Sequence, residues 1–183
     1  MKDKFNLNHL PMFIYGSSMG GLLAHYVSKR FGFRGVIYGA PCFKIPLDGC
    51  TKCIISFVAC CNPLQLPPPD SEPTFSRNLN VEEEVELDYP PESFSNFGTI
   101  NMLVQKCNNF VNSKNESHEK AILMIISGVE KIVCLETIVN YYNESKVKDK
   151  ESILYPNMWH GVLVEDEVYD LMPRMVKWIG DRL

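Results

Sequence analysis

The chain has 183 residues, 45% of them hydrophobic, which is enough to bury the core of one ordinary globular domain. Its formal net charge of −4 gives no basic footprint and argues against nucleic acid as a partner. The sequence predicts neither a transmembrane helix nor a secretory signal, and its seven cysteines do not form a disulfide framework. We therefore expect a protein of a reducing compartment, with a cytoplasmic location favoured.

The first predicted elements are a strand over residues 11–15, a helix over 18–31 and a second buried strand over 35–41. Apolar residues recur at helical spacing within the helix, Gly32 stops it, and Pro41 ends the second strand. A strand, a helix of about a dozen residues and another strand form a βαβ unit, so this part of the chain predicts a parallel sheet.

A G-x-S-x-G motif occupies residues 16–20, at the turn from the first strand into the helix. This context predicts a nucleophile elbow, in which Ser18 is the nucleophile and its Oγ stands above the carboxyl edge of the sheet. The backbone turns so sharply at such a serine that nearby residues must lack bulk. We assign this role to Gly16 and Gly20, and we expect Gly21 to let the helix pack close to the sheet.

The regular pattern stops over residues 42–110. This segment contains an apolar stretch over 53–61 that predicts a helix with one apolar face, a proline-rich part, the acidic run 82–84 and a helical pattern over 99–111. We interpret the acidic run as a solvated surface. Because an irregular insertion of this length is too long for a plain loop between two strands, it predicts a lid or cap.

The chain then returns to regular elements. Residues 121–126 are apolar throughout, as expected of a strand that is covered on both faces. A short helix over 137–145 follows, then the last predicted strand over 151–155 and a closing helix over 167–183 with one apolar stripe.

A serine nucleophile needs a base, and the base needs a carboxylate that fixes its tautomer. In a fold with this elbow the partners follow in the order serine, acid, histidine, each on the loop after a strand. His160 follows the last predicted strand and is the candidate base. Glu130 is the first carboxylate after the strand at 121–126 and is the candidate acid. Glu136 is the alternative acid, although a carboxylate at a helix start also has a structural explanation.

The other three histidines do not fit this order. His25 lies within the first predicted helix, and we interpret it as a surface or packed residue. His9 and His118 lie in polar segments without a pattern, and we expect both to be solvated.

Together these pieces resemble the monoacylglycerol lipase and lysophospholipase branch of the α/β-hydrolases, the serine aminopeptidase-like family. Residues 11–21 resemble its nucleophile strand and elbow, and residues 33–41 resemble the next strand, which also ends in Ala-Pro. Residues 128–133 resemble its acid loop, and residues 155–160 with Glu165 resemble its histidine loop. The likeness covers nearly all of the chain.

The resemblance implies one α/β-hydrolase domain over residues 1–183, with a parallel sheet, helices on both faces and a cap inserted over 42–110. It also implies a serine hydrolase that cleaves carboxylic esters of lipids, of the monoacylglycerol or lysophospholipid type, without a metal or other cofactor. Ser18 would form an acyl-enzyme, His160 would act as base, and the N–H of Met19 would hold the oxyanion. The oligomeric state is left open.

The sequence departs from the family pattern in two places. In the family, two residues usually separate the glycine of the acid loop from an aspartate, whereas one residue separates Gly128 from Glu130. The strands that normally precede the elbow would lie before residue 1, together with a His-Gly loop that supplies the second oxyanion donor. We therefore expect an N-terminally truncated domain, and one lost donor typically costs on the order of 100- to 1,000-fold in turnover.

These departures keep alternative functions open: a truncated, catalytically incompetent hydrolase-fold protein, or a small-ester esterase or peptidase on the same fold. In the predicted cap, Ile54, Phe57 and Val58 are candidates to line an acyl channel or to contact a membrane surface peripherally, as the cap of the family does. Ordinary packing within the cap is the other interpretation. A zinc cluster formed by the cysteines of this segment is disfavoured, because the surroundings are apolar and no histidine is near.

Overall fold

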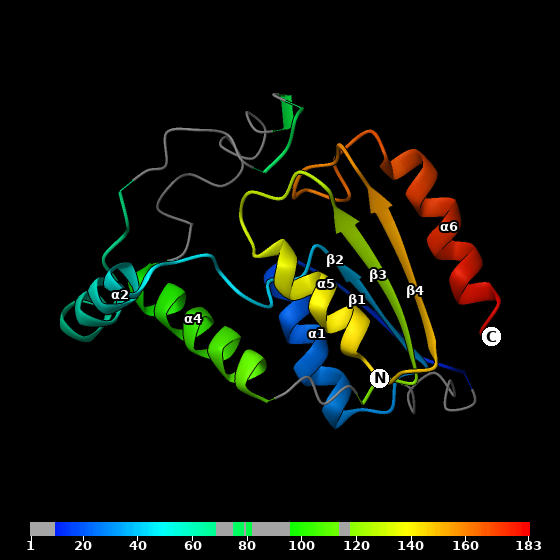
Figure 1. The fold of residues 1–183 in the computed structure, drawn as a ribbon, viewed down its shortest axis with the longest axis horizontal. Helices are drawn as coiled ribbons and strands as arrows, with labels where there is room; N and C mark the ends of the chain where they lie inside the picture. Colours follow the sequence, from blue (N-terminus) through cyan, green and yellow to red (C-terminus); the bar gives the residue numbers. More distant parts are fainter. Residues whose placement is uncertain (1–9, 69–74, 79, 82–95, 114–117) are drawn as a thin grey trace.

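The computed structural model describes residues 10–68, 75–78, 80–81, 96–113 and 118–183. Four parallel strands form one sheet in the order β1-β2-β3-β4 (Figure 1). The strands are β1 (Phe13–Ser17), β2 (Gly35–Gly39), β3 (Ala121–Ser127) and β4 (Asp149–Tyr155). Because all four run in the same direction, their carboxyl ends meet at one edge of the sheet.

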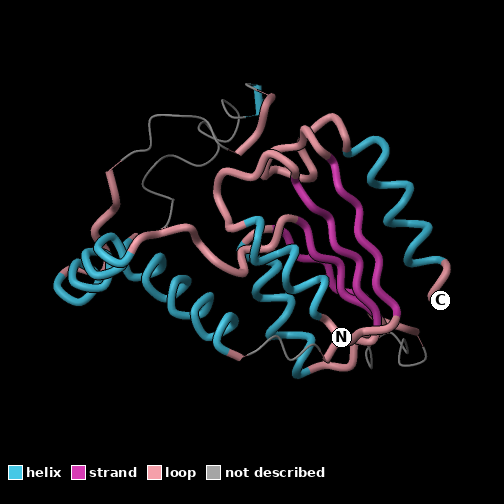
Figure 2. The backbone as a smooth tube through the Cα atoms, in the orientation of Figure 1, coloured by secondary structure: helices cyan, strands magenta, loops and turns pink. Residues whose placement is uncertain are grey.

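Helices cover both faces of this sheet (Figures 1 and 2). On one face lie α1 (Met19–Arg30), α5 (Leu135–Glu144) and the end of α4 (Phe97–Asn112), which bury Leu22, Ile138 and Phe110 against alternate side chains of β2 and β3. On the other face α6 (Val168–Gly180) buries Leu171, Met175 and Trp178 against the remaining side chains of the same strands. This arrangement confirms the expected α/β-hydrolase fold.

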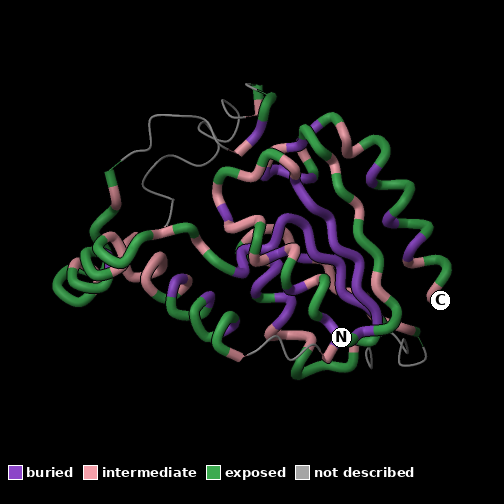
Figure 3. Tube along the Cα trace, viewed as in Figure 1, coloured by how far each residue is buried: buried purple, intermediate pink, exposed green. Residues whose placement is uncertain are grey.

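The burial of the strands follows their place in the sheet (Figure 3). The inner strands β2 and β3 are buried at every position, which explains their unbroken apolar sequences. β1 and β4 form the two edges of the sheet that the described residues build, and both are more exposed. The expected second strand, residues 35–41, ends two residues early because Ala40 turns into the positive-φ region at φ 39°.

The insertion, residues 42–110, leaves the sheet after β2 and holds two described helices. α2 (Gly49–Cys61) begins four residues before the predicted helix, because the Asp48 side chain caps it by accepting a hydrogen bond from the Thr51 N–H at 2.8 Å. α4 packs between α2 and the body of the protein (Figure 1). The acidic run 82–84 lies outside the described residues. None of the described helices has the length and apolar character that crossing a bilayer requires.

A polar cluster lies inside the core on the α1 side. Glu119, just before β3, accepts hydrogen bonds from the hydroxyls of Tyr38 at 2.5 Å and Tyr141 at 2.6 Å, and its Oε1 lies 3.1 Å from His25 Nδ1. Burial alone would raise the pKa of the Glu119 carboxyl. The hydrogen bonds from His25 and the two tyrosines outweigh burial and lower that pKa from 4.5 to about 2.

Two histidines, His25 and His118, contact Glu119 in this cluster. His25 is packed rather than at the surface, with 1% of the residue exposed. The expectation that His118 is solvated is wrong, because its Nε2 lies 2.8 Å from Ser28 Oγ on α1 and its ring packs edge-on against His25. His9 lies outside the described residues.

Candidate functional site

The candidate nucleophile, Ser18, links the end of β1 to the start of α1. Its backbone has φ 53° and ψ −124°, a conformation that costs a residue with a side chain about 1–3 kcal/mol. Three backbone hydrogen bonds hold it there: the Ser18 N–H donates to Gly39 O at 2.9 Å, and Ser18 O accepts from Gly21 N and Cys42 N at 2.9 and 2.8 Å. The end of β2 and the first turn of α1 therefore hold Ser18 in this strained conformation.

The glycines around Ser18 have different roles. A Cβ at Gly16 would lie 2.1 Å from Gly20 O, and a Cβ at Gly21 would lie 2.5 Å from Pro41 Cβ, so neither position has room for a side chain. Nothing lies within 4 Å of a Cβ placed at Gly20. The expectation that Gly20 must lack a side chain is therefore wrong: the close approach at the elbow is made by its carbonyl group, and Gly16 makes the space for it.

The candidate base and acid form a buried pair. His160 Nδ1 lies 2.8 and 3.0 Å from the two carboxylate oxygens of Glu130. The His160 side chain is 2% exposed and that of Glu130 is 0% exposed. Glu130 Oε1 also accepts hydrogen bonds from the backbone N–H groups of Ile132 at 2.8 Å and Val133 at 3.2 Å. The carboxylate is thus fixed on two sides, and its position favours a proton on Nδ1, which leaves Nε2 as the basic nitrogen.

Direct contacts between the acid loop and the histidine loop explain why the short spacing after Gly128 still brings the two residues together. The hydroxyl of Ser127, at the end of β3, donates to Trp159 O at 2.6 Å, and the Gly128 N–H donates to Tyr155 O at 2.9 Å. A Cβ at Gly128 would lie 2.3 Å from Pro156 O. Glycine at this position therefore lets the two loops approach closely enough for a carboxylate one residue further on to reach the histidine.

The histidine loop extends back across the sheet toward Ser18. Val162 lies over the end of β2, where its Cγ2 would be 2.8 Å from a Cβ at Gly39, and Gly39 O is the group that accepts from the Ser18 N–H. His160 Nε2 is buried and has no hydrogen-bond partner in the part of the chain that the structure describes. The site therefore presents the unpartnered Nε2 of His160 and the strained Ser18 at the carboxyl ends of the strands.

Glu136, the alternative acid, is exposed in the first turn of α5. A carboxylate there is favourable to the helix dipole, which is sufficient to explain its position. The structure places Glu130, and not Glu136, against the histidine.

A buried carboxylate fastens the insertion to the histidine loop. Glu165 accepts hydrogen bonds from the Ser76 hydroxyl at 2.7 Å, from the Arg77 N–H at 2.7 Å and from the Arg77 guanidinium. It also accepts a long bond of 3.4 Å from the N–H of Trp159, beside His160. Burial would raise the pKa of the Glu165 carboxyl, but these hydrogen bonds lower it.

We call the pairing of Arg77 with Glu165 the clamp. Its partner in the insertion could not be predicted from the sequence, because residues 75–78 form no regular element. The same segment touches the candidate base and the residue after it: the N–H of Gly161 donates to Phe75 O at 2.8 Å, and the Phe75 ring packs edge-on at 5.9 Å from the imidazole of His160.

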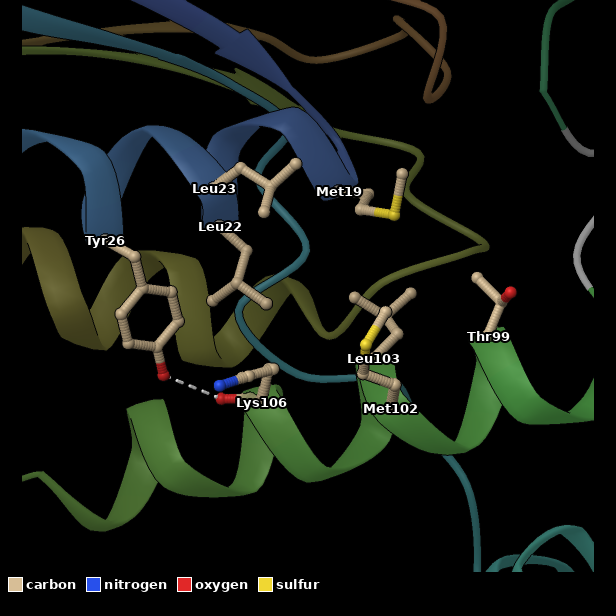
Figure 4. Close-up of a pocket in the computed structure, with 8 residues that line it drawn as sticks. All are labelled: Met19, Leu22, Leu23, Tyr26, Thr99, Met102, Leu103 and Lys106. Atoms are coloured by element: carbon tan, nitrogen blue, oxygen red, sulfur yellow. Dashed lines mark hydrogen bonds between the residues drawn. The ribbon is translucent and has the colours of Figure 1, made fainter. Parts of the chain in front are cut away.

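An apolar groove begins beside the candidate nucleophile, between α1 and α4 (Figure 4). We call it the α1–α4 groove, and its volume is about 320 Å³. Its lining residues are Met19, Leu22, Leu23, Tyr26, Thr99, Met102, Leu103 and Lys106. Met19 directly follows Ser18, and at the other end the Tyr26 hydroxyl donates to Lys106 O at 3.0 Å. The groove is therefore open to an apolar chain that starts near the serine.

The candidate cap residues lie elsewhere. Ile54 and Phe57 are on α2 and are 54% and 70% exposed, and Val58 is half-buried on the same helix. None of the three lines the α1–α4 groove.

The four cysteines of α2 are free and exposed. Among the described residues the potential metal ligands that gather are His25, His118 and Glu119, with ligand atoms within 4.8 Å of one another. The two carboxylate oxygens of Glu119 already accept bonds from His25, both tyrosines and the His118 N–H. That group is therefore satisfied as a hydrogen-bonded cluster.

The chain matches the family described as serine aminopeptidase, S33, over residues 2–167. Its fold is similar to that of the monoacylglycerol lipase of Paleococcus ferrophilus, with 17% identity and a TM-score of 0.78, covering 100% of this chain and 73% of that one. It is also similar to a soluble variant of the monoglyceride lipase of Saccharomyces cerevisiae in complex with a substrate analog. That match has 18% identity and a TM-score of 0.76, and it covers 100% of this chain and 69% of the lipase.

An uncharacterized abhydrolase domain-containing protein of Dictyostelium discoideum is 24% identical over 181 residues. The match covers 95% of this chain and 19% of that protein, so the chain spans about a fifth of the length of this relative.

Proposed function

Because this chain belongs to the serine aminopeptidase S33 family of α/β-hydrolases, we propose that it is a serine hydrolase that cleaves carboxylic esters of lipids. The observation that carries the proposal is the buried pair of His160 and Glu130, whose unpartnered Nε2 lies at the sheet edge that also holds the strained Ser18. A base, an acid that orients it and a serine on an elbow are the components of acyl transfer through a covalent intermediate.

We infer the reaction from the roles that such residues have in acyl transfer. His160 Nε2 takes the proton of Ser18 Oγ while Oγ attacks the acyl carbonyl carbon, and the N–H of Met19 donates to the oxyanion. Glu130 stabilises the imidazolium. His160 then gives the proton to the oxygen of the leaving alcohol, so that the ester bond breaks and an acyl-enzyme remains. Water attacks this intermediate with His160 again as base, and the fatty acid leaves.

The α1–α4 groove supports a lipid acyl group as the part of the substrate that is recognised. It is lined mainly by Leu and Met side chains, and Met19, Leu23 and Met102 remain 44–56% exposed in it. Exposed apolar side chains that gather in a groove mark a binding site for an apolar ligand. A monoacylglycerol or a lysophospholipid has one acyl chain, which matches one groove with one end near the nucleophile.

Labelling with a fluorophosphonate probe tests the nucleophile. We expect the full chain to be labelled, Ser18→Ala to lose the label, and Ser56→Ala, which changes an exposed hydroxyl on α2, to keep it. A well-folded chain that resists the probe would overturn the catalytic proposal and favour a catalytically incompetent hydrolase-fold protein. Circular dichroism on each variant separates this outcome from a failure to fold.

Substrate class is tested with esters of increasing acyl length, from acetate to oleate, beside an aminoacyl amide. Met102→Asp should raise KM for long-chain esters by about 10- to 100-fold, since several buried methylenes contribute about 0.8 kcal/mol each, while acetate hydrolysis is unchanged. Val111→Asp, at an exposed apolar position near the end of α4, is the control. Equal rates for acetate and oleate would argue for a small-ester esterase, and cleavage of the amide alone would argue for a peptidase.

A further inference from the structure

The outward face of α2 has an unusual composition. Its exposed residues at helical spacing are Cys50, Cys53, Ile54, Phe57, Cys60 and Cys61, which we call the thiol stripe. Positions separated by three, four and seven residues lie on one face of a helix, so the stripe is continuous along the whole length of α2. It consists of four thiols and two large apolar side chains, and it contains no charged residue.

The opposite face of α2 already has a partner within the protein. Ile55 is buried there, and the neighbouring Ser56 hydroxyl donates to Asn101 Oδ1 of α4 at 3.0 Å. α2 is the described helix that lies farthest from the sheet in Figure 1, and most of it is exposed in Figure 3. The thiol stripe therefore points away from the protein, and packing of the core does not explain its apolar composition.

Neither a disulfide nor a shared metal ion accounts for the four thiols. All four cysteines are free in the structure, and none belongs to a group of potential metal ligands among the described residues. At a rise of about 1.5 Å per residue, Cys50 and Cys61 are separated by roughly 16 Å along the helix, too far to bind one ion. Lys52 is the single charged residue of α2. Thiols on an exposed, nearly uncharged apolar helix are the arrangement in which cysteines become S-acylated at a membrane surface.

We propose that the thiol stripe is a site of S-acylation with long-chain fatty acyl groups, which anchors the insertion to a membrane surface. In the modification a cysteine Sγ attacks the carbonyl carbon of a long-chain acyl-coenzyme A. The new carbon–sulfur bond makes a thioester on the protein, the bond to coenzyme A breaks, and the cysteine proton ends on the coenzyme A thiol. No oxidant or reductant takes part.

The number of thiols matters for anchoring. One acyl chain holds a protein on a bilayer only marginally, whereas two or more chains give stable attachment. Four thiols allow this, and Ile54 and Phe57 add apolar side chains between them. Because α2 packs on α4, the anchored helix would bring the α1–α4 groove close to the bilayer surface. The modification itself does not depend on catalysis at Ser18.

The test is metabolic labelling of the full chain in yeast cells with an alkyne analogue of palmitic acid, followed by capture and treatment with neutral hydroxylamine, which cleaves thioesters. All proteins carry Ser18→Ala, so that neither an acyl-enzyme nor self-hydrolysis affects the signal. We compare this parent with a variant in which the four stripe cysteines are replaced by serine, and with Cys134→Ser as the matched control. Cys134 lies at the start of α5, outside the stripe.

The parent and Cys134→Ser should carry hydroxylamine-sensitive label and sediment with membranes, and the four-cysteine variant should lose at least 10-fold of both. Serine at exposed positions should leave the melting temperature unchanged, which shows that the loss is not unfolding. No label on the parent, or equal label on the four-cysteine variant, overturns the proposal. So does a lipid-free dimer that Phe57→Asp disperses in sedimentation velocity, because the stripe would then be an interface between copies of the chain.

Discussion

At the scale of single residues, the geometry around Glu130 determines what the histidine can do. The carboxylate accepts hydrogen bonds from the N–H groups of Ile132 and Val133 as well as from His160 Nδ1. A glutamine at this position would keep its oxygen toward the backbone donors and would turn its NH₂ group toward Nδ1. The imidazole would then carry its proton on Nε2, where it cannot accept the proton of Ser18.

Glu130→Gln is therefore expected to lower kcat by on the order of 1,000- to 10,000-fold with little change in KM, since the wrong tautomer affects the chemical step. The measurement is steady-state hydrolysis of a chromogenic ester. Glu136→Gln, on the exposed face of α5, should retain full activity. A larger loss in Glu136→Gln than in Glu130→Gln would assign the acid to the other residue.

The Glu119 cluster predicts a pH dependence of stability. The pKa of the Glu119 carboxyl is about 2 in the folded protein, against an ordinary value of 4.5. The folded state therefore binds the proton more weakly than the unfolded state. The resulting stability is fully present above about pH 4.5 and is lost as the pH falls toward 2. For a shift of this size it amounts to about 3 kcal/mol.

Glu119→Gln should thus be less stable than the wild type at pH 7, and the difference should shrink as the pH falls below 4.5. Urea unfolding at pH 7, 5, 4 and 3 measures it, with Glu136→Gln as an exposed carboxylate control. A stability difference that stays constant from pH 7 to pH 3 would contradict a depressed pKa at Glu119.

Residue patterns in the sequence predicted the positions of Ser18, His160 and Glu130, because the order of loops after strands constrains where each can lie. They did not predict Arg77 or the role of His118. Both residues lie in segments without periodicity and contact partners 88–93 residues away: Arg77 contacts Glu165, and His118 contacts Ser28 and the neighbouring His25. Spacing along the chain carries no information on such pairs.

At the scale of elements, the turn from β1 into α1 offers a matched pair of glycine substitutions. Gly16→Ala would place a Cβ 2.1 Å from Gly20 O, so the elbow would have to open. Gly20→Ala meets nothing within 4 Å and lies in a helix, where alanine is favoured over glycine by about 1 kcal/mol.

We expect Gly16→Ala to destabilise the fold by several kcal/mol and to abolish labelling of Ser18, while Gly20→Ala keeps the label and is slightly more stable. Thermal unfolding and fluorophosphonate labelling measure the two effects. If both alanines behaved alike, steric contact would not be the reason for glycine at position 16.

Every helix and strand that the sequence predicted within the described residues is present, and the differences lie at the ends. α4 starts at Phe97 rather than at 99 because Asn96 caps it, its Oδ1 accepting from the Thr99 N–H at 2.9 Å. Apolar periodicity shows the buried face of a helix, whereas its first residues are set by polar caps that have no period. The limits of α2 and α4 were therefore less predictable than their existence.

At the scale of the whole molecule, the clamp of Arg77 and Glu165 joins the insertion to the loop that holds His160. Arg77→Met would leave the buried Glu165 carboxylate with neutral donors alone. Since the Arg77 side chain is 36% exposed, the expected loss of stability is about 1–2 kcal/mol, below the cost of breaking a fully buried pair.

Hydrogen exchange in Arg77→Met should increase in residues 75–78 and 159–165 while β2 and β3 stay protected, and kcat should fall several-fold. Arg174→Met removes an exposed ion pair with Asp170, at 3.6 Å on α6, and should change neither quantity. Faster exchange throughout the sheet would show that Arg77 supports the global fold and not the histidine loop.

The placement of the insertion between two inner strands has a consequence for how such a domain can diverge. The chain between β2 and β3 is roughly five times as long as the chain between β1 and β2, yet closing it costs only about 1.4 kcal/mol more, because closure entropy grows with the logarithm of length. Lengthening or shortening the insertion is therefore almost neutral for the sheet. Descendants of one ancestral gene can accordingly change the length and sequence of this segment while inheriting Ser18, Glu130 and His160 unchanged.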